Sequence, residues 1–210
     1  MTQFKERDVQ LGPATPEQAE AAAPLMYDTD PALLGYMYSD GYEAALQFFA
    51  IEWRQERSLM SFSHCTAAVS GDSLLGIELG YDRKTQEELM SKTGVNGAAS
   101  LTGEGLGRLL EVVGYLPYLM PPIGEESYYV WFLSIHPSAR GQGLGSRLLN
   151  NAFEEARMQD KRLCELDVAS DSRAVAFYER MGMKVLSEAR VLPMERHGVA
   201  PHYRMVKDLT

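Results

Sequence analysis

The most informative part of the sequence comprises the stretch from Tyr128 to Ile135 (YYVWFLSI) and the glycine-rich segment Arg140–Gly145 (RGQGLG) soon after it. An almost unbroken run of aromatic and β-branched residues predicts a strand that is buried on both faces, and His136-Pro137 ends it. Apolar residues at helical spacing follow the glycines and predict an amphipathic helix: Leu144, Leu148, Leu149, Ala152, Phe153 and Ala156.

The glycines between this strand and this helix indicate an anion site. Residues without a Cβ let backbone N–H groups approach a ligand, and a helix N-terminus favours a phosphate or pyrophosphate. A Walker loop is excluded because no Gly-x4-Gly-Lys-Ser/Thr string occurs. A dinucleotide fingerprint fits poorly, since Ser146 stands where its last glycine belongs, although Asp167 could serve as the ribose-binding acid.

Strand and helix patterns also alternate through the rest of the chain, which predicts a mixed α/β sheet. We expect further strands over 7–12, 61–69, 74–81, 162–168, 185–192 and 202–209. A helix to Tyr27 is expected to begin at the capping box of Thr15 and Gln18, and a second at that of Asp40 and Glu43. A third is expected to be capped by Asp171 or Ser172 and to end at Gly182.

Residues 82–127 are interpreted as an insertion within one domain that spans residues 1–210. One helix face is expected to carry Leu106, Leu109, Leu110, Val113 and Leu116. The prolines of segment 115–122 argue against regular helix there. A second glycine-rich string, Gly103–Gly107, follows no strand signal and carries Glu104, so we interpret it as a flexible entry to the insertion helix.

Two motifs in the right order give the chain a resemblance to the GNAT superfamily of acyl-CoA-dependent N-acetyltransferases. Arg140-x-x-Gly143-x-Gly145 matches that family's strand–loop–helix pattern, in which Arg or Gln comes first. One helix later, Asp171-x-x-Ala174-x-x-Phe177-Tyr178 with Gly182 matches a second pattern, except that Asp171 replaces the usual Asn. The resemblance covers residues 128–183 strongly and the whole chain in the order of its elements.

This resemblance implies a mostly antiparallel sheet of about seven strands, flanked by helices, with a helical insertion between strands three and four. It implies acetyl-CoA as the acyl donor, with the pantetheine arm between splayed strands four and five. The backbone of Leu133, Ser134 and Ile135 would pair with that arm. The pyrophosphate would lie on Arg140, Gly141, Gln142, Gly143, Leu144 and Gly145, with Ser146 nearby; Asp171 leaves an amide contact in doubt.

Acetyl transfer to an amine needs a base for the ammonium and an acid for the leaving thiolate. Tyr178 matches the family's general acid. Glu126, just before the fourth strand, is our candidate for the base, with Glu78 and Asp167 as rivals and water as a further route. The expected activity is direct attack of a primary amine on acetyl-CoA in a ternary complex. The alternative is a non-catalytic acyl-CoA-binding or sensing module, because a fold does not guarantee its chemistry.

Composition restricts the partners. The formal net charge is −9, which disfavours a nucleic-acid binder. Residues 138–184 carry +1 and the remainder −10, so we expect a cationic or neutral amine acceptor. Two cysteines and four unclustered histidines suggest no metal site. The start MTQFKERDVQL lacks an apolar core, and no long apolar run occurs, so we expect a cytoplasmic protein without membrane contact. The Tyr- and Pro-rich segment 115–123 is compatible with a homodimer.

Overall fold

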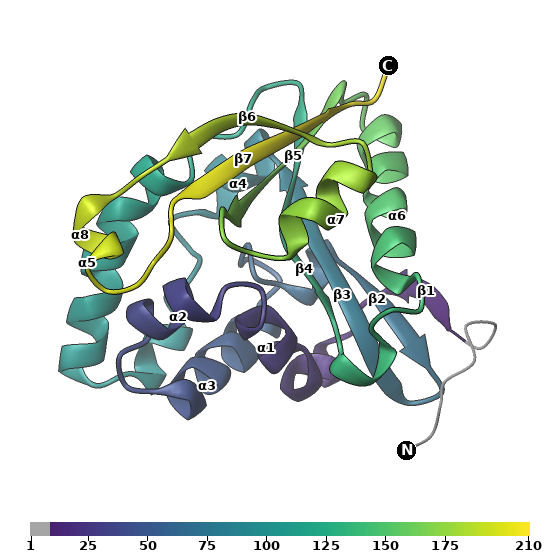
Figure 1. Cartoon of the computed structure of the whole chain (residues 1–210). Helices are drawn as coiled ribbons and strands as arrows, with labels where there is room; N and C mark the ends of the chain where they lie inside the picture. Colours follow the sequence, from purple (N-terminus) through teal and green to yellow (C-terminus); the bar gives the residue numbers. More distant parts are fainter. Residues whose placement is uncertain (1–8) are drawn as a thin grey trace.

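A computed structural model describes residues 9–210, which form a seven-stranded sheet flanked by helices (Figure 1). The strands are β1 (Gln10–Pro13), β2 (Cys65–Ser70), β3 (Ser73–Asp82), β4 (Ser127–Ile135), β5 (Leu163–Ala169), β6 (Lys184–Ala189) and β7 (His202–Asp208). Their order is β1-β2-β3-β4-β5-β7-β6. Among the strand pairs of residues 9–210, only β4 with β5 is parallel. The predicted mixed, mostly antiparallel sheet is therefore confirmed.

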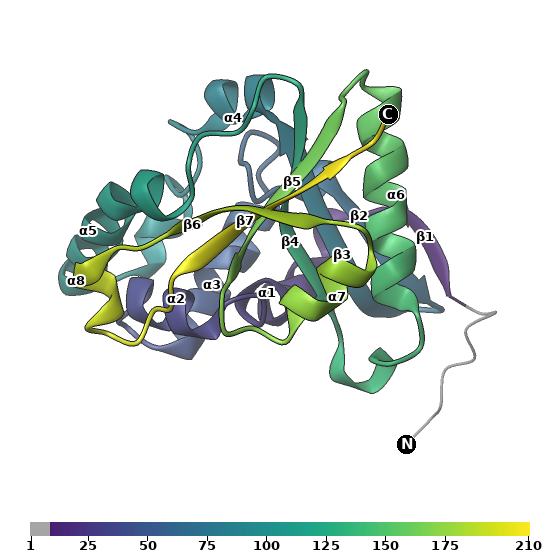
Figure 2. The same ribbon diagram turned by 45° about the horizontal axis from the view of Figure 1, so that its top comes forward.

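Helices cover both faces of the sheet. They are α1 (Ala19–Tyr27), α2 (Pro31–Met37), α3 (Tyr42–Trp53), α4 (Arg83–Leu89), α5 (Gly103–Leu119), α6 (Leu144–Met158), α7 (Ala174–Arg180) and α8 (Leu192–Glu195). Figures 1 and 2 show α1, α2 and α3 on one face, with α5 and α8 at its edge, and α6 and α7 on the other. The chain thus encloses its sheet between two helical layers.

The face that carries α1–α3 has the larger apolar core. Trp53 and Phe49 of α3 pack there with Met26 of α1 and with Ile77 and Phe132 of the sheet, all buried. The opposite face packs against α6, whose six predicted core residues are all buried, so this helix prediction is confirmed. Burying one Leu side chain contributes about 1.5–3 kcal/mol, so the apolar face of α6 stabilises the helix against the sheet while its outer face can be polar.

The start of α1 follows its predicted cap, whereas the start of α3 does not. The Thr15 N–H donates to Gln18 Oε1 at 2.9 Å, and a 3₁₀ turn over 16–18 leads into α1. The expected Asp40 cap is wrong. Gly41, at φ 102°, precedes α3, and the Asp40 carboxylate accepts from Thr102 N (2.6 Å) and Thr102 Oγ1 (2.7 Å). Asp40 therefore binds Thr102, which is distant in sequence, instead of forming a capping box with Glu43.

The insertion between β3 and β4 is helical, as predicted, but two of its details differ. The helix α5 includes Gly103 to Gly107 and continues to Leu119 through Pro117, because Pro117 lies in the exposed last turn, where one lost hydrogen bond is tolerated. Its buried face carries Leu109, Val112 and Leu119, while Leu110 and Val113 are exposed. Three of the five predicted positions, Leu106, Leu109 and Leu116, do pack against the core, so the buried face of α5 is shifted from the predicted one but overlaps with it.

Other boundaries shift for local reasons. The strand predicted over 7–12 extends beyond the described residues, and its described part is β1. Strand β2 begins at Cys65 because 62–64 form a 3₁₀ turn, and β6 ends before Pro193 starts α8. Ser172, not Asp171, accepts from the start of α7, at Ala174 N. Gly182 ends α7 at φ 84°, as predicted. That residues 1–210 make one domain stays a prediction.

Candidate functional site

The strands β4 and β5 separate after only three paired positions. Their register is Ser127↔Leu163, Tyr128↔Cys164 and Tyr129↔Glu165. Just beyond, Trp131 is an extra residue in β4, because Phe132 pairs with Leu79 and Val130 with Gly80 of β3. Such a bulge bends its strand. A gap therefore opens between β4 and β5, and it explains why the second half of β4 is partly exposed rather than buried on both faces.

Backbone groups of β4 face this gap. The His136 N–H donates to Leu75 O of β3 at 2.9 Å. Because backbone groups alternate along a strand, those of Leu133 and Ile135 point away from β3, toward the gap, and those of Ser134 point to β3. The backbone groups of Leu133 and Ile135 thus face the gap and those of Ser134 do not, and the predicted contacts with the pantetheine arm stay a prediction. Ile135 O already accepts from Arg140 Nε at 2.8 Å.

The glycine loop at the end of this gap has the conformation that an anion site requires. Gly141 and Gly143 have φ 75° and 77°, a region that residues with a Cβ rarely adopt. Within residues 9–210, the N–H groups of 141–145 donate no hydrogen bond. They lie at the N-terminus of the 15-residue α6. The predicted Arg140–Gly145 loop thus fits a pyrophosphate, whose oxygens would satisfy these donors.

The remaining predicted cofactor residues lie around the loop. Leu144 is buried under the sheet, Ser146 lies in the first turn of α6, and Gln142 Nε2 donates to Ser138 O at 3.2 Å. Asp171 is exposed in the turn that follows β5. Arg140 follows β4, and its guanidinium lies 3.4 Å from Asp28 Oδ2.

Tyr178 is buried between α7 and the sheet. It packs in the apolar cluster that includes Cys164, Leu166 and Val168 of β5. Its hydroxyl makes no hydrogen bond to the described residues. Burial, with a smaller effect of the Cys164 thiol, holds the pKa of Tyr178 well above its ordinary value. This phenol therefore keeps its proton at neutral pH and can act only as a proton donor.

Glu126 lies at the opposite end of β4 from the open gap. Its side chain is 63% exposed and stands 3.6 Å from Arg162. It precedes the paired part of β4, roughly 20 Å along the strand from Phe132 at about 3.3 Å per residue. Its role as the base stays a prediction. Because it lies far from the open gap, a carboxylate closer to the gap is a better candidate for the base.

Glu78 and Asp167, the two rivals, lie on opposite faces of the sheet. Glu78 is buried beneath α6, where burial raises its pKa to about 8 and Tyr128 Oη donates to it at 3.4 Å. Asp167 lies on the α1–α3 side, two residues beyond the last pair of β4 with β5. Burial raises the pKa of Asp167, against the opposing effect of Arg204.

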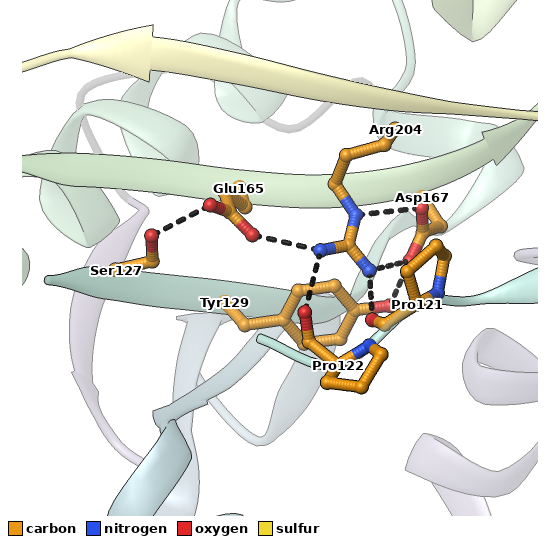
Figure 3. Close-up of polar contacts among 7 residues, drawn as sticks. All are labelled: Pro121, Pro122, Ser127, Tyr129, Glu165, Asp167 and Arg204. Carbon is orange, nitrogen blue, oxygen red and sulfur yellow. Dashed lines mark hydrogen bonds and ion pairs between the residues drawn. The ribbon is translucent and has the colours of Figure 1, made fainter. Parts of the chain in front are cut away.

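A buried network surrounds Asp167, and the sequence patterns did not indicate it (Figure 3). Arg204 Nε and Nη2 donate to Asp167 at 2.8 and 2.7 Å, and Nη1 donates to Glu165 at 2.8 Å. Tyr129 Oη donates to Asp167 Oδ2 at 3.0 Å, and Ser127 Oγ to Glu165 Oε1 at 2.6 Å. Two carboxylates thus share one guanidinium, which leaves one excess negative charge where β4 and β5 begin to part.

The same guanidinium reaches the insertion. Its Nη1 and Nη2 donate to the carbonyl oxygens of Pro122 and Pro121, the segment between α5 and β4. Alternation along β5 and β7 could have suggested that Glu165, Asp167 and Arg204 share one face, but only the register Asp167↔Arg204 shows that they meet.

Among the described residues, no group of three His, Cys, Asp or Glu side chains could hold a metal ion.

Comparisons with known proteins agree with this geometry. The family described as "Acetyltransferase (GNAT) family" matches residues 79–183. Two proteins named L-2,4-diaminobutyric acid acetyltransferase are similar to this chain. That of Shouchella clausii is 33% identical over a match that covers 30% of this chain and 36% of the relative. That of Marinococcus halophilus is 27% identical over a match that covers 48% of this chain and 59% of the relative. The chain thus matches less than two thirds of either relative.

The fold has a close counterpart among solved structures. An N-acetyltransferase from Staphylococcus aureus Mu50 superposes with a TM-score of 0.67 at 13% identity, over 94% of this chain and 100% of the other. At that identity the likeness concerns the fold alone.

No helix in residues 9–210 has both the length and the apolar character needed to span a bilayer.

Proposed function

Because this chain belongs to the GNAT acetyltransferase family, we propose that it transfers the acetyl group of acetyl-CoA to a primary amine by direct attack in a ternary complex. One observation carries the proposal: the gap between β4 and β5 ends on a glycine loop whose N–H groups are unpartnered within the described residues. Acetyl-CoA would supply the activated thioester.

The chain's own residues divide the binding of acetyl-CoA between two regions. The N–H groups of 141–145 and the N-terminus of α6 would hold the pyrophosphate. The outward backbone groups of Leu133 and Ile135 would pair with the pantetheine amides, as one strand pairs with another. In this arrangement the reacting end of the donor would lie along β4 toward Trp131, where the bulge lies.

Tyr178 supports the acid step. A phenol is protonated at neutral pH, burial raises the pKa of this one further above its ordinary value, and the ring packs on β5 beside the gap. We assign to it the delivery of a proton to the departing thiolate. Its hydroxyl donates to no other described residue, so it is available to donate to the thiolate.

For the base we favour Asp167, reached through Tyr129, over the exposed Glu126. Tyr129 Oη donates to Asp167 Oδ2, so a proton lost by the ammonium can pass through the hydroxyl to the carboxylate. The excess negative charge of Glu165 and Asp167 over Arg204 stabilises the added proton. Glu126, by contrast, lies at the closed end of the strands and faces solvent.

A small cationic amine is the acceptor class that we favour. The −10 balance outside residues 138–184 raises the local concentration of cations. The relatives in the comparison are named for 2,4-diaminobutyric acid, a compound with two amino groups. The family and the charge balance support this class without singling out one compound.

Calorimetry and a turnover assay test the proposal together. Coenzyme A should bind the wild-type chain, and NAD should not. Gly143→Val should abolish most of that affinity, because it places a β-branched side chain at φ 77° within the loop. A panel of mono- and diamines, read out by thiol release, should then give turnover. Binding without turnover on any amine would favour the sensing module, and absence of binding would overturn the proposal.

A further inference from the structure

The turn Asp28-Thr29-Asp30, between α1 and α2, is bound to both sides of the β4–β5 gap. On the β4 side, Asp28 Oδ2 lies 3.4 Å from Arg140, whose Nε donates to Ile135 O, the last residue of β4. On the β5 side, Asp30 Oδ2 lies 2.9 Å from His202 Nε2. His202 pairs with Ala169, the last residue of β5. The turn therefore spans the gap.

The Asp30 contact is the fixed one. The His202 side chain is 1% exposed, and its Nδ1 lies 3.0 Å from Ala200 O, which can only accept. Both ring nitrogens thus face acceptors. Although burial alone would lower the pKa of His202, its hydrogen bond to Asp30 raises it, which favours an imidazolium beside the Asp30 carboxylate. Asp30 Oδ1 also accepts from Leu33 N at 3.0 Å and caps α2. Figures 1 and 2 show α2 beside the start of β7, as this contact requires.

The Asp28 contact is the weak one. The side chains of Arg140 and Asp28 are 55% and 38% exposed, and a single long contact of 3.4 Å joins them. Exposed pairs of this kind contribute little and are screened by salt. A pyrophosphate on the adjacent loop would offer Arg140 a stronger partner, since guanidinium binds phosphate oxygens in a bidentate manner.

We propose that Asp28 is a positioning residue that holds Arg140 in the free protein and gives it up to the pyrophosphate of the bound donor. The inference rests on the proposed function, because it places the donor on the 141–145 loop. Donor binding then releases the turn on its Asp28 side while Asp30 stays fixed to His202.

A double-mutant cycle measured by calorimetry tests this exchange. In the wild-type background, Asp28→Asn should tighten coenzyme A binding about two- to fivefold, the range for an exposed ion pair. In the Arg140→Gln background, the same change should have no effect. Glu43→Gln, which removes another acidic charge beside Tyr42 without touching Arg140, is the matched control and should leave the affinity unchanged. Asp28→Ser repeats the test if the Asn variant folds poorly.

Hydrogen exchange gives an independent readout. Added coenzyme A should speed exchange in a peptide that covers 28–30 and leave the peptide around His202 unchanged. Equal tightening in both backgrounds would indicate simple charge repulsion and overturn the exchange of partners, as would no tightening at all. Coenzyme A binding without this coupling overturns the present inference alone, whereas a wild-type chain that does not bind coenzyme A overturns the proposed function as well.

Discussion

At the scale of single residues, the site depends on side chains whose surroundings fix their protonation. Burial keeps the Tyr178 phenol protonated, and burial opposed by Arg204 makes Asp167 readier to take a proton than an exposed aspartate. The two groups lie on opposite faces of β5, because Tyr178 packs with Cys164 and Leu166 while Asp167 alternates with them. The proposed acid and the proposed base can thus reach one gap from two sides.

Tyr178→Phe removes only the hydroxyl and keeps the ring in the apolar cluster. We expect kcat to fall by about 10²–10⁴-fold, the usual effect of losing a general acid, with little change in coenzyme A affinity. Single-turnover kinetics and calorimetry measure the two quantities. Turnover at the wild-type rate, with chemistry limiting, would reduce Tyr178 to a packing residue.

Tyr129→Phe and Glu126→Gln separate the two candidate routes for the ammonium proton. If Asp167 acts through Tyr129, Tyr129→Phe should lower kcat/KM at neutral pH by at least about tenfold, and more alkaline pH should recover part of it, because free amine then becomes abundant. Glu126→Gln, an exposed position, should leave the pH–rate profile unchanged. The reverse pattern would restore Glu126 as the base.

At the scale of elements, Arg204 joins three parts of the chain that are distant in sequence. From β7 it binds Glu165 and Asp167 of β5 and the carbonyl oxygens of Pro121 and Pro122 at the end of the insertion. Its guanidinium also stands 5.4 Å from the centre of the Tyr129 ring, on β4 (Figure 3). The insertion is thus fixed to the sheet where β4 and β5 part.

Arg204→Met should destabilise the protein by about 3–5 kcal/mol, because it leaves Glu165 and Asp167 buried without a cation. Urea unfolding measures the change in the free energy of unfolding. Arg57→Met, at an exposed arginine of the α3–β2 connection, is the control and should change it by no more than about 0.5 kcal/mol. Equal effects of the two variants would show that the network adds no stability.

At the scale of the whole molecule, pH should act on stability through Glu78, a carboxyl with no cation among its hydrogen-bond or ion-pair partners in residues 9–210. Burial raises its pKa to about 8, above the ordinary 4.5. The folded state therefore binds more protons than the unfolded state between these values. The stability that Glu78 contributes is complete below about pH 4.5 and is lost as pH rises toward about 8.

Glu78→Gln should remove this pH dependence, since the amide mimics the neutral acid. Between about pH 5 and 8 the variant should gain stability over wild type, by about 1.4 kcal/mol per unit of pKa difference at most. Thermal unfolding in a pH series measures it, with Glu56→Gln, at an exposed position, as the control. Parallel curves for wild type and Glu78→Gln would contradict the raised pKa.

The resemblance to a family indicated Tyr178, whereas local patterns of residues predicted the strand β4, the glycine loop and the helix α6. Each of these is local: apolar periodicity, Pro137 and the glycines at positive φ act within a few residues. The order of these elements, together with the resemblance of their motifs to a family, also indicated the mixed sheet and the helical insertion.

The long-range contacts of the site could not be predicted from local patterns of residues. Asp40 binds Thr102 instead of capping α3, packing leaves Leu110 and Val113 of α5 exposed, and Arg204 contacts Asp167 because β7 lies beside β5. The same holds for Asp28 with Arg140 and Asp30 with His202, pairs more than 100 residues apart along the chain. Such contacts depend on which elements become neighbours, and no local pattern of residue types carries that information, because one carboxylate can satisfy a near donor or a far one at similar free energy.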